Sequence, residues 1–318
     1  MADCMMIVLW IVLAVLVLGF LFFFLPFYII ADKQMKILFT RTSPEKWDRT
    51  VNFPDDPEYV SMVRGGEAWS YDHRNVMTEV SITNDGLRLC GQYYDFGHDK
   101  AVILIPGRTE GCTYACYFAE PYRKAGYNVL AIDSRSHGHS EGRYNNLGLK
   151  EYRDILAWGK LLHGKRGIKS IVCHGVCIGS ATALYAFTSE GCPQYFTAIV
   201  ADGMYTTFRE SFREHLVQDK RPIFPFINIF FMIYRCRTGV NPGANGPIHC
   251  IGRMTRPILF LHSRQDVFSL PGKAQVLYDK CPSDHKKIVF FDTGRHSFVR
   301  INNTEAYDFA VTDFLNSL

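Results

Sequence analysis

A cysteine in a glycine-flanked turn is the first residue of this chain with a clear chemical use. Cys177 stands in a Gly-Val-Cys-Ile-Gly segment, two residues after Gly175 and two before Gly179, and this segment follows the apolar run Ser170–His174. A sharp strand-to-helix turn needs small residues at those two positions and holds the central side chain above the sheet, at a helix N-terminus. That end of a helix favours negative charge and therefore a thiolate. The N–H of Ile178 would be one hydrogen-bond donor to an oxyanion.

Two further residues complete a possible catalytic set. Asp266 comes just after the apolar run Pro257–His262, and His296 comes just after Lys287–Asp292. A histidine can take the proton of a thiol, and an aspartate can fix the tautomer of that histidine. Each residue alone has an ordinary alternative, a loop histidine or a helix-capping aspartate. Together with Cys177, in the order nucleophile, acid, histidine and each at a strand end, they predict a Cys-His-Asp triad.

The cysteine has an ordinary alternative as well. A Gly-x-Cys-x-Gly segment is short, and taken alone Cys177 is equally well explained as a small buried side chain. Cys173 lies in the middle of the preceding strand, where a packing role is expected. Ser180 falls inside the following helix and is a poor substitute nucleophile.

The remaining apolar patterns predict the elements that would position these residues. Short apolar runs predict strands at Thr78–Thr83, Leu87–Phe96, Ala101–Pro106, Asn128–Asp133, Ser170–His174, Thr197–Ala201, Pro257–His262 and Lys287–Asp292. Helical spacing predicts helices at Tyr114–Ala125, Leu149–His163, Ile178–Ser189 and Thr304–Leu315. Strands that alternate with helices of this length form βαβ units. The sequence therefore predicts a mostly parallel central sheet with helices on both faces.

These motifs resemble the α/β-hydrolase superfamily, near the serine aminopeptidase-like and monoacylglycerol-lipase-like hydrolases, over roughly residues 78–318. The segment Ile105–Arg108 (IPGR) resembles the family's oxyanion segment. Residues 125–129 (AGYNV) and 133–142 (DSRSHGHSEG) resemble its G-Y-x-V and D-x-R-G-H-G-x-S-x-G motifs. The resemblance implies an α/β-hydrolase fold and a second oxyanion N–H from Arg108.

The chain departs from the family pattern at three positions. Pro106 replaces a histidine before the oxyanion glycine, and Ser136 replaces a glycine. Both changes lie beside the site and are expected to alter loop detail only. Cys177 replaces the nucleophilic serine, which bears on the reaction itself. Dienelactone-hydrolase-like enzymes use a cysteine on the same fold, so the resemblance allows a Cys-His-Asp triad.

The N-terminus predicts a membrane anchor. Met5–Ile30 contains no charged residue and is long enough to cross a hydrocarbon core of about 30 Å as a helix. The run is too long for a signal peptide and ends in large side chains, so an uncleaved anchor at residues 1–31 is favoured. The rest is predicted to comprise a connector at 32–76 and a hydrolase domain at 77–318, with a proline-containing cap insertion at 203–255.

Charge and cysteine usage limit the partners. Basic residues follow the apolar span and almost none precede it, so the positive-inside tendency places the catalytic domain on the cytoplasmic side. A formal net charge of +4 without a basic block predicts no nucleic-acid partner.

The ten cysteines favour reduced thiols, since a large domain rarely needs disulfides. Cys112 and Cys116 have no second pair at zinc spacing, so neither a metal nor a cofactor is predicted.

The predicted function is hydrolysis of an ester, thioester or related acyl bond through an acyl-enzyme on Cys177. The apolar run Ile223–Tyr234 of the cap suggests a small-molecule acyl or lipid-like substrate, although ordinary cap packing explains it equally well. Two alternatives stay open: a non-catalytic relative that binds a ligand or partner, and an acyltransferase whose acceptor is not water. The sequence carries no signal for an oligomeric state.

Overall fold

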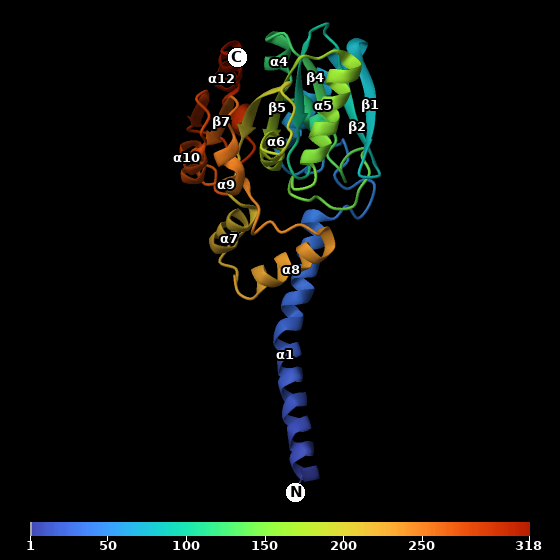
Figure 1. Cartoon of the computed structure of the whole chain (residues 1–318), viewed down its shortest axis with the longest axis vertical. Helices are drawn as coiled ribbons and strands as arrows, with labels where there is room; N and C mark the ends of the chain where they lie inside the picture. Colours follow the sequence, from blue (N-terminus) through green and yellow to red (C-terminus); the bar gives the residue numbers. More distant parts are fainter. Residues whose placement is uncertain (1) are drawn as a thin grey trace.

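The computed structural model describes residues 2–318 and contains one eight-stranded sheet with the order β1-β2-β4-β3-β5-β6-β7-β8 (Figure 1). The strands are β1 Met77–Asn84, β2 Leu87–Tyr94, β3 Lys100–Ile105, β4 Asn128–Ile132, β5 Ser170–Val176, β6 Phe196–Asp202, β7 Ile258–Ser263 and β8 Lys286–Phe291. The pairs β1–β2 and β2–β4 are antiparallel, and every other pair is parallel. The predicted fold class, a mostly parallel α/β-hydrolase sheet, is confirmed.

Helices cover both faces of this sheet because its central strands are apolar on both sides. In β3, Val102 and Leu104 pack into one core cluster, whereas Ile103 and Ile105 pack into the other, together with Trp158. This alternation follows from the two-residue period of a strand. The covering helices are α3 Cys112–Cys116, α4 Glu120–Lys124, α5 Tyr152–Arg166, α6 Ile178–Phe187, α10 Pro271–Lys280, α11 Val299–Asn302 and α12 Thr304–Asn316.

One predicted helix is wrong. The segment Tyr114–Ala125 forms two short helices, α3 and α4, with a break between them. Pro121 stands in the first turn of α4, where its missing N–H costs nothing, and it cannot continue a helix from the preceding turn.

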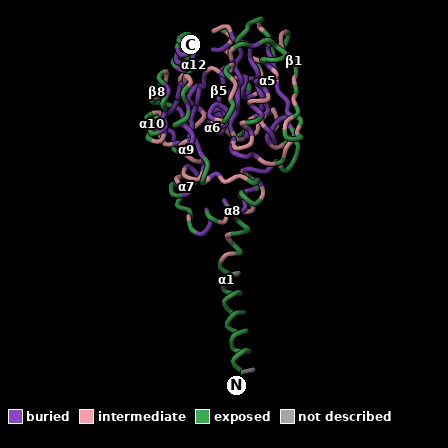
Figure 2. The backbone as a smooth tube through the Cα atoms, in the orientation of Figure 1, coloured by how far each residue is buried: buried purple, intermediate pink, exposed green. Residues whose placement is uncertain are grey.

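The first helix, α1 (Ala2–Phe39), has two parts that differ in exposure (Figure 2). Its large apolar side chains are exposed along most of its length up to Ile30. From there a stripe at four-residue spacing, Ala31, Met35 and Phe39, is fully buried against the domain. The helix therefore continues past residue 31, where the anchor was predicted to end. It is the one helix among residues 2–318 that is long and apolar enough to cross a membrane.

The segment predicted as a cap contains α7 (Phe208–Gln218), α8 (Phe226–Thr238) and α9 (Pro247–Cys250). Helix α8 packs against the domain end of α1, at the end of the molecule from which α1 projects (Figure 1). The ring of Phe39 lies 5.2 Å from those of Phe208 and Tyr234, edge to face in both pairs, and Arg237 forms an ion pair with Asp32. The predicted connector contains one further helix, α2 (Pro57–Asp72), which packs on α3.

Candidate active site

Cys177 occupies a strained turn between β5 and α6. Its φ is +54°, a value that few residues other than glycine adopt, and its N–H donates to the carbonyl of Asp202 at 2.8 Å. A Cβ on Gly175 would lie 2.2 Å from the backbone of Gly179, and a Cβ on Gly179 would lie 2.2 Å from the carbonyl oxygen of Ile105. The two glycines are therefore required by close backbone approach, as a nucleophile elbow requires.

Replacing Gly179 by alanine should lower the free energy of unfolding by about 3 kcal/mol or more, because the carbonyls of Ile105 and Pro106 leave no room for a methyl group. Urea unfolding of the detergent-solubilised protein measures this. Gly164→Ala is the matched control, since Gly164 lies in α5 and, beyond its own helix backbone and chain neighbours, no atom of residues 2–318 lies within 4 Å of the added Cβ. It should be neutral or stabilise by up to about 1 kcal/mol. Equal effects of the two variants would contradict this account of the elbow.

Asp266 and His296 lie in the loops after β7 and β8, and the structure joins them directly. Nδ1 of His296 lies 2.6 Å from Oδ2 of Asp266. The other carboxylate oxygen accepts the backbone N–H groups of Phe268 and Ser269, at 2.9 and 2.7 Å. The carboxylate is thus fixed by three hydrogen bonds, and it in turn orients the imidazole.

The charges around His296 favour its protonated form. Burial lowers the pKa of His296, but the negative charges of Cys177 and Asp266, and the hydrogen bond to Asp266, outweigh it and raise that pKa well above its ordinary value. Burial raises the pKa of Asp266, and the charge and hydrogen bond of His296 outweigh this, so the pKa lies below its ordinary value. The arrangement therefore favours an imidazolium at His296, between the carboxylate of Asp266 and the side chain of Cys177.

The second ring nitrogen of His296, on the side of Cys177, has no hydrogen-bond partner among the described residues. Nε2 of His296 is buried and makes no hydrogen bond of acceptable geometry within residues 2–318, although Cys177 is close enough to act on its pKa. Hydrogen bonds of catalytic groups are often long or poorly aligned before a substrate binds. Cys177 itself is 8% exposed. The site thus brings together all three residues of the predicted triad.

The two predicted oxyanion donors also lie at this edge of the sheet. Ile178 is the first residue of α6, so its N–H has no acceptor within the helix. The N–H of Arg108 makes no hydrogen bond within the described part of the chain. The carbonyl of Arg108 accepts from Nε2 of buried His137, whose ring stacks on Trp47 at 4.7 Å. His137 thus holds the loop at Arg108, the predicted oxyanion loop, in place.

Ser180 has a structural place rather than a reactive one. It is fully buried, and its hydroxyl lies 2.6 Å from the carbonyl oxygen of Gly175 and 2.9 Å from that of Asp202. The hydroxyl therefore ties the turn to the end of β6.

Three buried residues near the triad were missed by the sequence reasoning. Tyr307 of α12 donates its hydroxyl proton to Asp202 at 2.8 Å, and the same hydroxyl lies 3.1 Å from Nε2 of His174. Asp202 directly follows the predicted strand Thr197–Ala201, as Asp266 follows the predicted strand Pro257–His262, and this position is the sequence signal that could have identified it. Burial raises the pKa of Asp202 to about 7, although the hydrogen bond from Tyr307 and the charge of His296 act in the opposite direction.

Asp202→Asn should change how stability depends on pH. The carboxyl has a higher pKa in the folded chain, about 7, than its ordinary value near 3.9, so stability is lost as pH rises between these values. Between pH 5 and pH 8 the wild type should lose about 2–3 kcal/mol more than the variant, as measured by urea unfolding. Asp284→Asn, at an exposed position, is the control and should not alter the profile. A parallel profile for Asp202→Asn and wild type would show that Asp202 is not a buried neutral acid.

A second histidine supports the acid loop. His262, at the end of β7, is 1% exposed, and its Nε2 lies 2.5 Å from the carbonyl oxygen of Ser269 and 3.7 Å from Oδ2 of Asp266. Burial lowers the pKa of His262, which favours the neutral ring as a donor to Ser269. The ring of Phe268 in the same loop lies 4.9 Å from the ring of His296. The loop around Asp266 is therefore fixed from both sides.

Comparison with known proteins agrees with the fold described above. A family model described as alpha/beta hydrolase fold matches residues 100–222, which contain the oxyanion segment and the elbow. The chain is therefore similar to α/β hydrolases in this segment and has their fold. Among solved structures, it is similar to the esterase Pf2001 of Pyrococcus furiosus, with a TM-score of 0.64 and 24% identity over 78% of this chain and 93% of that one. It is also similar to mouse alpha/beta hydrolase domain-containing protein 10, with a TM-score of 0.55 and 15% identity over 76% of this chain and 98% of that one.

Two curated relatives extend the comparison. The chain is 27% identical to the uncharacterized protein YqkD of Bacillus subtilis, over 71% of this chain and 75% of that protein. It is 26% identical to the uncharacterized membrane protein YNL320W of Saccharomyces cerevisiae, over 78% of this chain and 74% of that protein. These similarities establish the fold of the chain.

Proposed function

We propose that this protein is a membrane-anchored hydrolase that cleaves an ester, thioester or related acyl bond through Cys177, His296 and Asp266. The observation that carries the proposal is the placement of His296. Its Nδ1 is 2.6 Å from the Asp266 carboxylate, and its pKa is raised by the charge of Cys177 on its other side. A histidine between an acid and a nucleophile in a strained elbow is the arrangement that acyl transfer requires.

The proposed reaction has two steps. The Cys177 sulfur attacks the acyl carbon, and the N–H groups of Ile178 and Arg108 stabilise the oxyanion that forms. The bond to the leaving alcohol or thiol breaks, His296 gives that group a proton, and the acyl group remains on sulfur as a thioester. Water then attacks this thioester while His296 takes one of its protons. The acid leaves, and the proton returns to the Cys177–His296 pair.

The proposed anchor is α1, whose apolar side chains are exposed up to Ile30. Asp32, Lys33 and Lys36 follow at once and mark the expected membrane surface. The basic residues on this side of the span support a cytoplasmic catalytic domain. The yeast relative is itself named a membrane protein, which supports a membrane location here.

Turnover and alkylation test the proposed function together. The full-length protein, in detergent or lipid nanodiscs, is incubated with p-nitrophenyl and thioester substrates, with and without iodoacetamide. We expect release of free acid, loss of turnover after alkylation, and Cys177 as the first thiol modified. No turnover together with no selective alkylation at Cys177 would favour a non-catalytic binding protein. Transfer of the acyl group to an added alcohol, in place of release of the acid, would favour the acyltransferase.

A further inference from the structure

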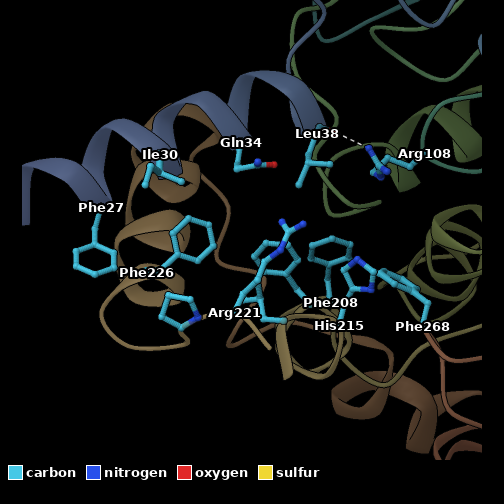
Figure 3. A pocket seen from close by; sticks show the side chains of 13 residues that line it. Phe27, Ile30, Gln34, Leu38, Arg108, Phe208, His215, Arg221, Phe226 and Phe268 are labelled. Carbon is cyan, nitrogen blue, oxygen red and sulfur yellow. Dashed lines mark hydrogen bonds between the residues drawn. The ribbon is translucent and has the colours of Figure 1, made fainter. Parts of the chain in front are cut away.

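A cavity connects the proposed membrane helix with the triad region. Its volume is about 470 Å³, within the usual range for small-molecule sites. Figure 3 shows Phe27 and Ile30 of α1 at one end, and Arg108 and Phe268 at the other. Arg108 belongs to the oxyanion segment, and the ring of Phe268 lies 4.9 Å from that of His296. The cavity therefore reaches from the exposed apolar part of α1 to residues that contact the triad.

One face of α1 forms a wall along this cavity. Phe27, Ile30, Gln34 and Leu38 recur at three- and four-residue spacing, so they lie on the same side of the helix. Leu38 lies eleven positions after Phe27, which corresponds to roughly 17 Å along the helix axis. The first two belong to the segment with exposed apolar side chains, and the last two belong to the segment packed on the domain. A single wall, apolar except for Gln34, thus runs from the expected bilayer into the protein.

The facing wall comes from the cap and is mostly apolar. Phe208, Phe212 and Leu216 of α7 and Phe226 of α8 line it, and all four side chains are buried. The loop between α7 and α8 lies on the side from which α1 projects (Figure 1), and Phe224 in this loop is 70% exposed. An exposed phenylalanine at this place is suited to contact with lipid.

Arg108 connects the inner end of the cavity to the end of α1. Its guanidinium donates to the carbonyl of Leu38 at 3.0 Å, in the last turn of the helix (Figure 3). A second cavity of about 620 Å³ shares Leu38 and Arg108 with the first as lining residues. Its lining is more polar than that of the first cavity and includes Lys46 and Asn52. An acyl chain on the apolar side and a polar leaving group on the other side would place the scissile carbonyl beside the oxyanion loop.

We propose that this cavity is an acyl-chain channel that admits one long linear acyl chain of a lipid resident in the membrane around α1. This proposal rests on the proposed function, because it names the substrate class of the same site. The chain enters between α1 and the cap, at Phe27 and Ile30, and its carbonyl reaches Cys177. The membrane helix is then one wall of the substrate site as well as an anchor.

A variant that narrows the channel tests the proposal. Leu216→Trp in the full-length protein places a larger side chain in the cavity, and Val217→Trp, at the neighbouring position with 45% exposure, is the matched control. In nanodiscs, we expect Leu216→Trp to lower kcat/KM for palmitoyl substrates by at least about tenfold and to leave butanoyl substrates unchanged. Val217→Trp should affect neither. Equal loss on both substrates, or no loss on either, would overturn the channel. Ile30→Trp, at the membrane end, repeats the test without changing a buried residue.

A binding measurement separates the channel from the chemistry. Full-length Cys177→Ala protein in phosphatidylcholine vesicles is irradiated with a diazirine-bearing palmitic acid, and the labelled peptides are sequenced. We expect labels on α7 and α8, together with the Gln34–Leu38 end of α1. Labels confined to Met5–Leu25, the part of α1 that contacts bulk lipid, would overturn the channel. Absence of turnover on every substrate would contradict the proposed function. The labelling pattern would still show whether the acyl chain occupies the channel.

Discussion

Cys177→Ala should abolish acyl turnover, with a loss of about 10⁴-fold or more in kcat, because no other side chain in the elbow can form the acyl-enzyme. Ser180 cannot replace it, since its buried hydroxyl is held by the carbonyls of Gly175 and Asp202. Steady-state hydrolysis of p-nitrophenyl butanoate by the full-length protein measures the loss.

Cys173→Ala is the matched control for this substitution. Cys173 lies four residues earlier in β5, is fully buried in the core, and is separated from the triad. Its replacement removes a thiol of the same kind and should leave kcat unchanged. Cys177→Ser should retain esterase activity, because the family pattern places serine there. Undiminished turnover by Cys177→Ala would remove Cys177 from the mechanism.

Asp266→Asn should lower kcat by about 10³- to 10⁴-fold while the fold persists. The asparagine carbonyl can still accept the N–H groups of Phe268 and Ser269, so the loop keeps its hydrogen bonds. The amide carries no charge, and it no longer fixes the tautomer of His296 or stabilises its protonated form. The pH profile of kcat/KM should change shape as well, since the charge of Asp266 contributes to the raised pKa of His296.

Asp284→Asn controls for the general effect of removing a carboxylate, because Asp284 is exposed and lies outside the site. It should leave both kcat and the pH profile as they are. A loss of less than tenfold in Asp266→Asn, with an unchanged profile, would assign the acid role to another group. Asp202 would then be the candidate, since His296 acts on its pKa and it ends the neighbouring strand β6.

Most of the sheet and the placement of the triad residues could be predicted from the sequence because the signals are local. Each strand is a short apolar run, and Cys177, Asp266 and His296 each follow such a run. The break between α3 and α4 also has a local signal, because Pro121 can begin a helix but cannot continue one, whereas the apolar spacing around it runs on without a break.

The features that were missed depend on partners far apart in the chain. Asp202 receives its hydrogen bond from Tyr307, 105 residues away, and no short motif joins them. The C-terminal end of α1 could not be predicted for the same reason, because it depends on contacts with distant residues. Asp32 and Lys36 interrupt the apolar run, yet the helix continues because Met35 and Phe39 pack on the domain. The apolar cavity arises only when α1, α7 and α8 come together, and composition alone could not distinguish it from ordinary cap packing.

Capture of the acyl-enzyme tests the central claim most directly. The full-length protein is mixed with p-nitrophenyl butanoate, quenched in acid within the first turnovers, and examined by intact-mass and peptide mass spectrometry. We predict one butanoyl group, removable by hydroxylamine, on the peptide that contains Cys177, and none on Cys177→Ala. Consumption of the substrate with no acyl group on Cys177, or with the acyl group on another residue, would contradict a cysteine nucleophile at this elbow.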